Sequence, residues 1–289
     1  MNDSALSPLL VFFLGVCVGV ALSTLVYVFW PSVQKWFYRT YQAFSDPYDL
    51  GFPFQHPQLI ILVRNGYCLA FDQKFCVARW AVHKMSKFSI TARLVEKRSS
   101  FLIDKDLPNS LQVLPSFYDK KPWDRGHLVP CEDLNYSPLS SKQTFLMSNI
   151  VPQDAKLNRR AWRSLEHNIR LWAEILGEIH VVTGVFIGKR PKKINAQVSI
   201  PRGFYKVIYS ELVERAIAFY YPNEPLQARD LWQAEYVMSI KTLENRLQEG
   251  EGVEYRFFPL ITGSLRNRVV NDCEIDYWLT LLNQRKKRR

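Results

Sequence analysis

The residues best suited to chemistry lie in three short segments near the middle of the chain. Residues 124–127 read Asp-Arg-Gly-His, residues 148–153 read SNIVPQ, and residues 158–166 read NRRAWRSLE. Together they supply a histidine, neutral amides, a carboxylate and several arginines. Hydrolysis of a phosphodiester needs a base for the attacking water and cations that neutralise the developing charge, so these segments predict a phosphodiesterase site.

The first segment supplies a candidate general base. The unperturbed pKa of a histidine is about 6.5, so its imidazole can accept a proton from water near neutral pH. His127 is the candidate, because Gly126 lets the backbone approach closely and Asp124 can fix the local geometry. The remaining histidines are interpreted as ordinary surface or core residues: His56, His83, His167 and His180.

These three segments resemble those of the DNA/RNA non-specific endonuclease family, the ββα-metal group that includes endonuclease G and the secreted Serratia-type nuclease. The resemblance covers most of residues 51–265, and its motifs are concentrated in residues 124–170. It implies a Mg²⁺-dependent endonuclease that cuts DNA and RNA without strict sequence choice. It also implies products with 5′-phosphate ends, and members of the family are often homodimers.

The resemblance implies a role for each matching residue. His127 is the expected general base, and Asn158 is the expected sole protein ligand of Mg²⁺, with Mn²⁺ as a substitute. An asparagine oxygen suits this task because Mg²⁺ prefers oxygen ligands and keeps several waters. Glu166 would hold water around the cation, Arg170 would bind phosphate, and Asn149 would lie beside the site.

The resemblance also implies a second phosphate-binding arginine, upstream and shortly before an aromatic residue. Arg98, which precedes Phe101, is the best candidate, and Lys97 is the alternative. The chain departs from the family at Cys131 and Glu132, where small or apolar residues are common. We expect this change to affect substrate preference without removing activity.

Basic residues predict further contacts with nucleic acid. Such contacts are expected at Arg125, Arg159 and Arg160; for the last two, and for Arg163, an ordinary solvated helix face is the alternative. The chain has 38 Lys and Arg against 27 Asp and Glu, a formal net charge of +11. This excess favours a polyanionic partner, either nucleic acid or an anionic membrane surface, over a basic surface kept only for solubility.

The N-terminal part contains a long apolar run. No charged residue occurs in residues 9–30, which as a helix would extend roughly 33 Å and cross a bilayer. We predict an uncleaved single-pass anchor, and a cleaved signal peptide is the alternative. The predicted organisation is a leader at 1–8, the transmembrane anchor at 9–30, a linker at 31–50, the endonuclease domain at 51–282 and a basic tail at 283–289.

The anchor bears on location. Relatives with an apolar N-terminal anchor include mitochondrial enzymes that face the intermembrane space, so the resemblance favours the mitochondrial inner membrane. No Lys or Arg precedes Lys35, however, unlike an ordinary matrix-targeting leader. The envelope of a bacterial cell is therefore the alternative location, and the membrane orientation stays open.

The cysteines give little indication of a metal centre. No CxxC pair occurs among the five cysteines, so a structural zinc site is not expected. Cys68 and Cys76 flank a predicted turn and are interpreted as buried thiols, with a disulfide as the alternative in an oxidising compartment.

A helix over residues 155–176 must position most of the candidate residues. Its apolar side chains recur at helical spacing: Ala161, Leu165, Ile169, Trp172 and Leu176. Strands are predicted over 59–63, 67–71, 76–82, 89–94, 179–187, 199–209 and 257–260, and further helices over 226–247 and 274–282. The predicted fold is α+β, with a central mainly antiparallel sheet flanked by helices.

Two other functions remain open at this point. The first is a membrane-tethered nucleic-acid-binding protein that keeps the nuclease fold but has little activity. The second is a relative that prefers to act as an exonuclease, which spacing alone does not decide.

Overall fold

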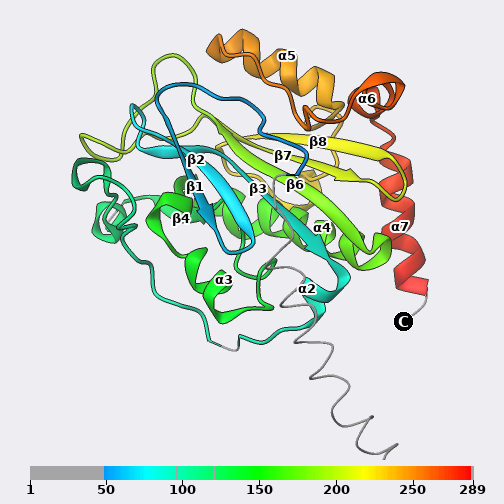
Figure 1. The fold of residues 1–289 in the computed structure, drawn as a ribbon, viewed down its shortest axis with the longest axis horizontal. Coiled ribbons are helices and arrows are strands. Elements are labelled where there is room, and N and C mark those ends of the chain that lie inside the picture. Colours follow the sequence, from blue (N-terminus) through cyan, green and yellow to red (C-terminus); the bar gives the residue numbers. More distant parts are fainter. Residues whose placement is uncertain (1–48, 96, 120, 288–289) are drawn as a thin grey trace, which may run out of the picture. The chain divides into compact units, whose positions relative to one another are not determined.

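The computed structural model describes residues 49–95, 97–119 and 121–287 (Figure 1). These belong to a unit that spans Asp46–Arg289. The predicted leader and anchor lie outside the described residues, as does most of the predicted linker. Within the described ranges, no helix is both long and apolar enough to span a bilayer.

A seven-stranded sheet forms the centre of this unit. Its strand order is β1-β2-β3-β6-β7-β8-β9, and every neighbouring pair is antiparallel. The strands are β1 (Leu59–Arg64), β2 (Tyr67–Asp72), β3 (Val77–Ser86), β6 (Glu178–Phe186), β7 (Gly203–Ser210), β8 (Arg215–Pro222) and β9 (Val237–Met238). The predicted α+β fold with a central antiparallel sheet is therefore confirmed.

Both faces of the sheet are buried. Successive side chains of a strand point to opposite faces. In β7, Phe204 and Ile208 join one apolar cluster, whereas Tyr205 and Val207 join another. The sheet is thus the middle of three layers, which explains why its strands are almost continuously apolar.

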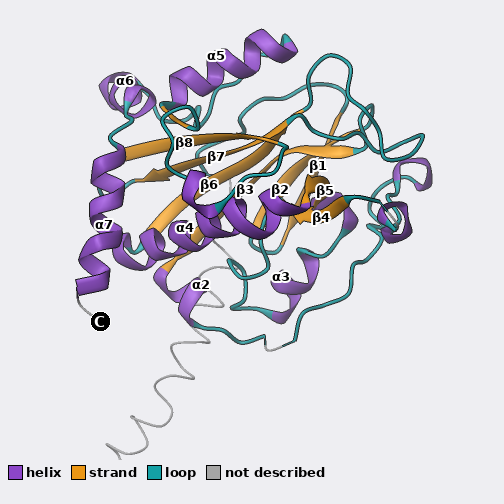
Figure 2. Cartoon of the chain, turned by 180° about the vertical axis from the view of Figure 1, so that it is seen from behind, coloured by secondary structure: helices purple, strands orange, loops and turns teal. Residues whose placement is uncertain are grey.

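Different helices cover the two faces of the sheet (Figures 1 and 2). Figure 2 shows α4 (Arg163–Leu176) crossing one face, near the short strands β4 (Trp123–His127) and β5 (Ile150–Asp154). The opposite face packs against α5 and α6. The remaining helices are α2 (Lys87–Thr91), α3 (Pro138–Gln143), α5 (Ile240–Glu251), α6 (Gly263–Asn271) and α7 (Ile275–Lys287).

The candidate residues lie in a long excursion between two neighbouring strands. The chain leaves the sheet after Ser86, at the end of β3, and returns at Glu178, the residue paired with Ser86. The backbone N–H of Lys87 donates to the carbonyl of Gly177, 2.7 Å away, which closes the excursion. Within it, β4 and β5 pair only with each other, as a separate two-stranded sheet.

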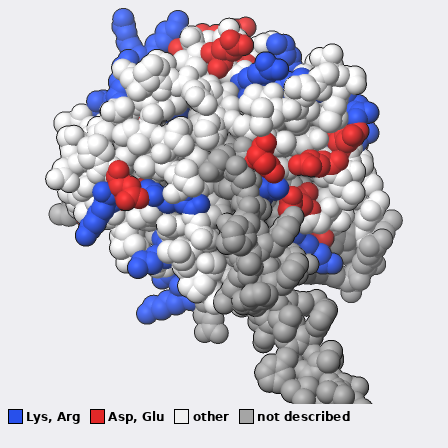
Figure 3. Space-filling view, viewed as in Figure 1, with Lys and Arg blue, Asp and Glu red and all other residues white. Residues whose placement is uncertain are grey.

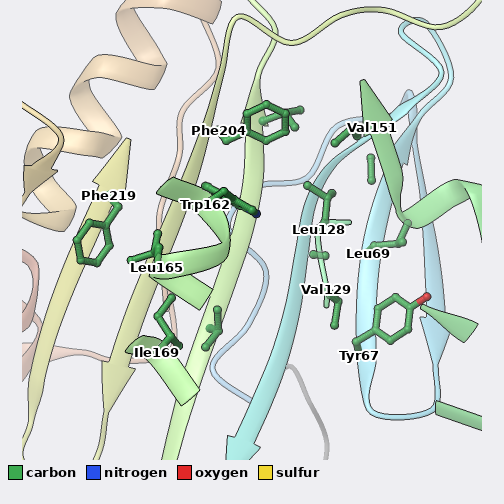
Figure 4. Packing of buried hydrophobic residues seen from close by; sticks show 14 of the residues in the cluster. Tyr67, Leu69, Leu128, Val129, Val151, Trp162, Leu165, Ile169, Phe204 and Phe219 are labelled. Atoms are coloured by element: carbon green, nitrogen blue, oxygen red, sulfur yellow. The ribbon is translucent and has the colours of Figure 1, made fainter. Parts of the chain in front are cut away.

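The predicted helix over 155–176 has two parts. It starts with a π-helical turn, Leu157–Trp162, and continues as α4. The predicted apolar stripe is buried along its whole length, which confirms the periodicity. Figure 4 shows Trp162 directed toward Phe204 of the sheet, with ring centroids 5.5 Å apart. A wide turn is common where a helix carries functional residues.

The prediction of a strand over residues 89–94 was wrong. Residues Lys87–Thr91 form α2 instead, because the hydroxyl of Ser86 accepts from the N–H of Ser89, and the hydroxyl of Ser89 accepts from the N–H of Ser86. This reciprocal capping starts a helix in a segment whose side chains alone favour a strand.

The C-terminal half also differs from the prediction. A helix over 226–247 was predicted, but only Ile240–Glu251 is a full helix, and Val237–Met238 pairs with β8. The strand predicted over 257–260 is absent from the described structure, because Phe258 has a φ of 51° that interrupts an extended backbone. Strand β8 and helix α6 were not predicted.

Cys68 and Cys76 are buried, as expected, and are not joined by a disulfide. Cys68 belongs to one apolar cluster and Cys76 to the cluster on the other face of the sheet. The sheet therefore keeps the two thiols apart.

Candidate active site

Strand β4 carries the Asp-Arg-Gly-His segment and is held by β5. Gly126 lies opposite Val151, and His127 opposite Ile150. A Cβ atom on Gly126 would collide with the side chain of Gln153. Only glycine fits this close approach, so the residue type at 126 follows from the packing that places His127.

The imidazole of His127 lies between two aromatic rings. Its ring centroid is 5.6 Å from that of Phe101 and 5.0 Å from that of Phe145. Burial, with a smaller contribution from the charge of Arg98, lowers the pKa of His127 to about 3. The ring is therefore neutral at neutral pH, and its Nε2 has no hydrogen-bond partner in the described part of the chain.

Asp124 connects β4 to the π-helical turn. The side-chain nitrogen of Asn158 donates to Asp124 Oδ2 at 2.9 Å, and Arg159 donates to both carboxylate oxygens at 2.8 and 2.6 Å. Since the nitrogen of Asn158 is held by Asp124, its carbonyl oxygen points elsewhere and is available to a ligand. The turn itself starts where Asp154 accepts from the N–H of Leu157, 3.0 Å away.

Glu166 is in the first turn of α4. Burial raises its pKa to about 7, although the charges of Lys206 and Arg170 oppose this shift. Lys206, on β7, is itself fully buried; it donates to the hydroxyl of Thr183 at 2.7 Å. The carboxylate of Glu166 thus lies near a buried ammonium group that favours its ionised form.

A hollow of about 460 Å³ brings several of these side chains together. It is lined by Arg98, Ser99, Phe101, Arg125, His127, Pro130, Cys131, Glu132, Phe145, Asn158, Arg159, Arg163 and Glu166. We call it the catalytic hollow. Four arginines face two glutamates there, so its lining carries an excess of positive charge. The predicted base, the predicted metal ligand and the predicted water-holding carboxylate therefore share one cavity.

Arg170 is not among the residues that line the catalytic hollow. Its guanidinium donates to Asp133 at 2.9 Å and contacts Glu132 at 2.8 Å. Asp133 is buried and also accepts from Nε2 of His83, 3.1 Å away. Burial opposes ionisation of Asp133, but the hydrogen bond from His83 and the charge of Arg170 lower its pKa.

A second hollow adjoins the outer side of α4. It is lined by Glu132, Arg159, Arg160, Arg163, Ser164, His167, Asn168, Arg170, Gln227 and Ala228. We call it the arginine hollow. Arg160 lies only there and donates to Gln227, whereas Arg159 and Arg163 line both hollows. On the face seen in Figure 3, by contrast, the described basic and acidic side chains form small separate groups on a largely uncharged surface.

Two predicted site residues, Asn149 and Arg125, are held by contacts within the chain. The amide of Asn149 is fully buried; it accepts from the N–H of Val129 and donates to the carbonyls of Val129 and Thr144. Asn149 therefore fixes the chain just after His127 and does not line the catalytic hollow. Arg125 does line it, while also pairing with Asp119 at 2.6 Å.

Several functional neighbours were not predicted. Phe101 and Phe145 enclose His127, and Asp133 with His83 anchors Arg170. These contacts depend on tertiary packing and leave no local pattern in the sequence. The sequence did single out Glu132, because it occupies a position where small or apolar residues are common in the family.

The catalytic hollow fits a hard divalent cation. Asn158 offers an amide oxygen and Glu166 a carboxylate, the oxygen donors that Mg²⁺ prefers. Another group of potential ligands, Asp49, His180 and Glu211, lies outside this hollow. There Nε2 of His180 contacts Glu211 at 2.6 Å and Nδ1 contacts Asp49 at 3.5 Å. Because these nitrogens point to different sides of the ring, the group is arranged as an ion-pair cluster.

The sequence model of the DNA/RNA non-specific endonuclease family matches residues 48–259. The chain belongs to this family of nucleases, which are hydrolases. The family assignment made from the three segments is therefore confirmed.

Similarity to individual relatives agrees with the family. A nuclease from Nostoc sp. is 30% identical over 201 residues, which are 65% of this chain and 72% of the relative. The human protein named "Nuclease EXOG, mitochondrial" is 28% identical over 197 residues, covering 62% of this chain and 53% of the relative. The chain thus spans only about half the length of the human protein.

A solved structure shares the fold. A chain in the crystal structure of the EndoG/EndoGI complex superposes with a TM-score of 0.69 at 20% identity, covering 79% of this chain and 95% of that one. At this identity, the likeness concerns the arrangement of strands and helices.

Proposed function

We propose that this chain is a Mg²⁺-dependent endonuclease that hydrolyses DNA and RNA without strict sequence choice. The observation that carries the proposal is the shared catalytic hollow of His127, Asn158 and Glu166, surrounded by arginines. Family membership supports it, because the matched range, residues 48–259, contains all three residues, and the resemblance of their segments implies these roles.

His127 takes the proton of the attacking water. Its imidazole is neutral in the free protein and can accept a proton without first losing one. A phosphodiester placed beside it would raise the pKa of His127 from about 3, because a nearby negative charge favours the protonated ring. The aromatic rings of Phe101 and Phe145 keep the imidazole in place during this transfer.

Asn158 and Glu166 would hold a cation and its water. The carbonyl oxygen of Asn158 would be the direct ligand, and its side chain is oriented by the hydrogen bond to Asp124. Glu166 would accept hydrogen bonds from water beside Asn158. A bound divalent cation would supply Lewis acidity to neutralise charge on the phosphate and its leaving group.

Arginines supply affinity for the nucleic-acid backbone. Arg98, Arg125 and Arg159 line the catalytic hollow, and Arg160 lines the arginine hollow. Contacts of this kind bind phosphates of any sequence, so they support cleavage without strict sequence choice. Arg170 would bind phosphate once its contact with Glu132 is released.

Digestion of circular plasmid and of RNA tests this function. The purified full-length chain would be compared with His127→Ala and Asn158→Ala, each in Mg²⁺ and in EDTA. We expect metal-dependent cleavage of the closed circle, and a loss of kcat in both variants by about 10²- to 10⁴-fold, the range for removal of a general base. Cleavage of a closed circle also separates an endonuclease from an exonuclease, which needs an end.

Binding separates the nuclease from a tethered binder. His127→Ala should bind DNA as tightly as the unchanged chain, because His127 adds no positive charge in the free protein. If the folded, unchanged chain binds DNA in a salt-sensitive manner but cuts nothing in Mg²⁺ or Mn²⁺, the catalytic proposal is refuted and the binder remains.

We further propose a mitochondrial location, with residues 9–30 as an anchor and the nuclease domain in the intermembrane space. The support is the names of relatives from Homo sapiens and Schizosaccharomyces pombe, both designated mitochondrial. The Nostoc nuclease keeps a bacterial envelope open as the alternative. Protease protection in isolated mitochondria, before and after rupture of the outer membrane, would test the location.

A homodimer is a further proposal from the family resemblance. Light scattering of the purified chain would test it.

A further inference from the structure

We propose that Glu132 determines substrate affinity by occupying the phosphate position between Arg98 and Arg170 in the free protein. The inference rests on the proposed function, since it concerns how the same site admits a phosphodiester. In this view Glu132 is a built-in competitor that the nucleic-acid backbone must displace.

The carboxylate of Glu132 bridges the two arginines that the family resemblance assigns to phosphate. Its Oε2 lies 2.8 Å from Nη2 of Arg170, and its Oε1 lies 3.9 Å from Nη2 of Arg98. Two oxygens of one anion thus face two guanidinium groups, which is how arginines commonly bind a phosphate. The position is therefore already filled by an anion of the chain itself.

Glu132 also stands between the two hollows. It lines both of them, whereas Arg98 lines only the catalytic hollow and Arg170 is among the residues of the arginine hollow. Arg159 and Arg163 also line both hollows, so a nucleic-acid strand that extends from one hollow to the other would lie along these two arginines and beside Glu132. The carboxylate would repel the backbone there unless it moves aside.

Glu132 can move, whereas its neighbour Asp133 cannot. The side chain of Glu132 is 53% exposed, and that of Asp133 is 4% exposed and held by His83 as well as by Arg170. The pair between Glu132 and Arg98 is exposed at both side chains, so its loss costs little stability. The side chain of Arg170 is only 14% exposed, but a phosphate that replaces Glu132 would keep its guanidinium paired with an anion. Arg170 would remain oriented by Asp133 after Glu132 has left.

Glu132→Gln tests the inference, because it removes the charge and keeps the shape. We expect the KM for plasmid to fall about three- to tenfold at low salt, with kcat unchanged within about twofold. Removing a negative charge from the phosphate position should also steepen the dependence of log affinity on log salt by about 0.9 for duplex DNA. Thermal unfolding would verify that the variant is folded.

Glu214→Gln is the matched control. Glu214 is 49% exposed and pairs with Arg268, so this variant changes the net charge equally in a similar environment outside both hollows. It should leave KM and the salt dependence unchanged. An equal effect of both variants would overturn the inference, because net charge alone would then explain it.

DNA binding in the His127→Ala background, in EDTA, provides a readout without catalysis. Tighter binding when Glu132→Gln is added supports the competitor, even if the chain proves inactive and the proposed function fails. If the unchanged chain cleaves plasmid but Glu132→Gln leaves affinity unaltered or weakens it, the inference is refuted while the proposed function stands. A fall in kcat with weaker Mg²⁺ dependence would instead place Glu132 among the groups around the cation, which also refutes it.

Discussion

The carboxylate of Asp124 accepts hydrogen bonds from two residues of the π-helical turn, Asn158 and Arg159. One oxygen accepts from both Asn158 and Arg159, and the other accepts only from Arg159. The side chain is 15% exposed, so these hydrogen bonds are partly shielded from water. The orientation of the proposed metal ligand therefore depends on a residue that is not among those that line either hollow.

Asp124→Ala should weaken the binding of Mg²⁺. Without its partner, the amide of Asn158 can rotate and present nitrogen in place of oxygen. Loss of a residue that orients a ligand typically costs about 10–100-fold in metal affinity or activity. We expect the Mg²⁺ concentration for half-maximal cleavage to rise by this factor.

The control for this change is Asp106→Ala. Asp106 also pairs with an arginine, Arg64, but the pair is not part of either hollow. Titration of cleavage activity with Mg²⁺ should give the same midpoint for Asp106→Ala as for the unchanged chain. If Asp124→Ala has that midpoint too, Asp124 does not position the metal ligand.

At the scale of residues, the sequence indicated which side chains lie together better than it indicated the contacts that they make. The three motif segments indicated His127, Asn158 and Glu166, which the structure brings into one hollow. The motifs could not indicate that Glu132 contacts Arg170, because that contact depends on how the loop after β4 packs against α4. Motifs define local geometry, whereas ion pairs between segments depend on the complete fold.

Among the elements, the π-helical turn Leu157–Trp162 carries the proposed metal ligand and a residue of the core. It carries Asn158 at its start and Trp162 at its end. Trp162 is 1% exposed and packs against Phe204 with the two rings tilted by 58°, while the ammonium group of Lys206 lies 4.8 Å from the centre of the indole ring. The wide turn is thus fastened to the sheet by one large side chain.

Trp162→Ala should destabilise the protein and disturb the site together. Removing a fully buried tryptophan costs about 3–5 kcal/mol of unfolding free energy, because it leaves a cavity. Urea denaturation would measure this loss. Trp162→Phe should cost less, since it keeps a ring beside Phe204 and removes an indole N–H that has no partner among the described residues. Equal losses for the two variants would show that packing of the ring is not what holds the turn.

The elements that the sequence predicted correctly are those with a long regular pattern. The stripe from Ala161 to Leu176 and the strands β1, β2, β3, β6 and β7 are such cases. Strand β8 was missed although its side chains are almost all buried. Two other failures are short segments where one local feature outweighs the side-chain pattern. Capping by Ser86 makes α2 a helix, and a positive φ at Phe258 prevents a strand.

At the scale of the whole molecule, the nuclease unit Asp46–Arg289 should be separable from the predicted anchor. A fragment starting at residue 46 should unfold cooperatively and cleave plasmid with the kcat of the full-length chain. The full-length chain should stay with membranes after alkaline carbonate extraction, whereas the fragment should be released. Release of both proteins would contradict the anchor, and a fragment without a cooperative transition would contradict a separable domain.

The closed excursion between β3 and β6 has a consequence for how this protein can change over time. Residues 87–177 begin and end beside one backbone hydrogen bond, between Lys87 and Gly177, and the flanking strands β3 and β6 pair directly with each other. We expect that this segment can be exchanged with that of a relative, provided that the apolar stripe of α4 that packs on the sheet is kept. Substrate preference can therefore diverge by recombination within one contiguous stretch of gene, and chimaeras joined at these two residues are the natural way to transfer it.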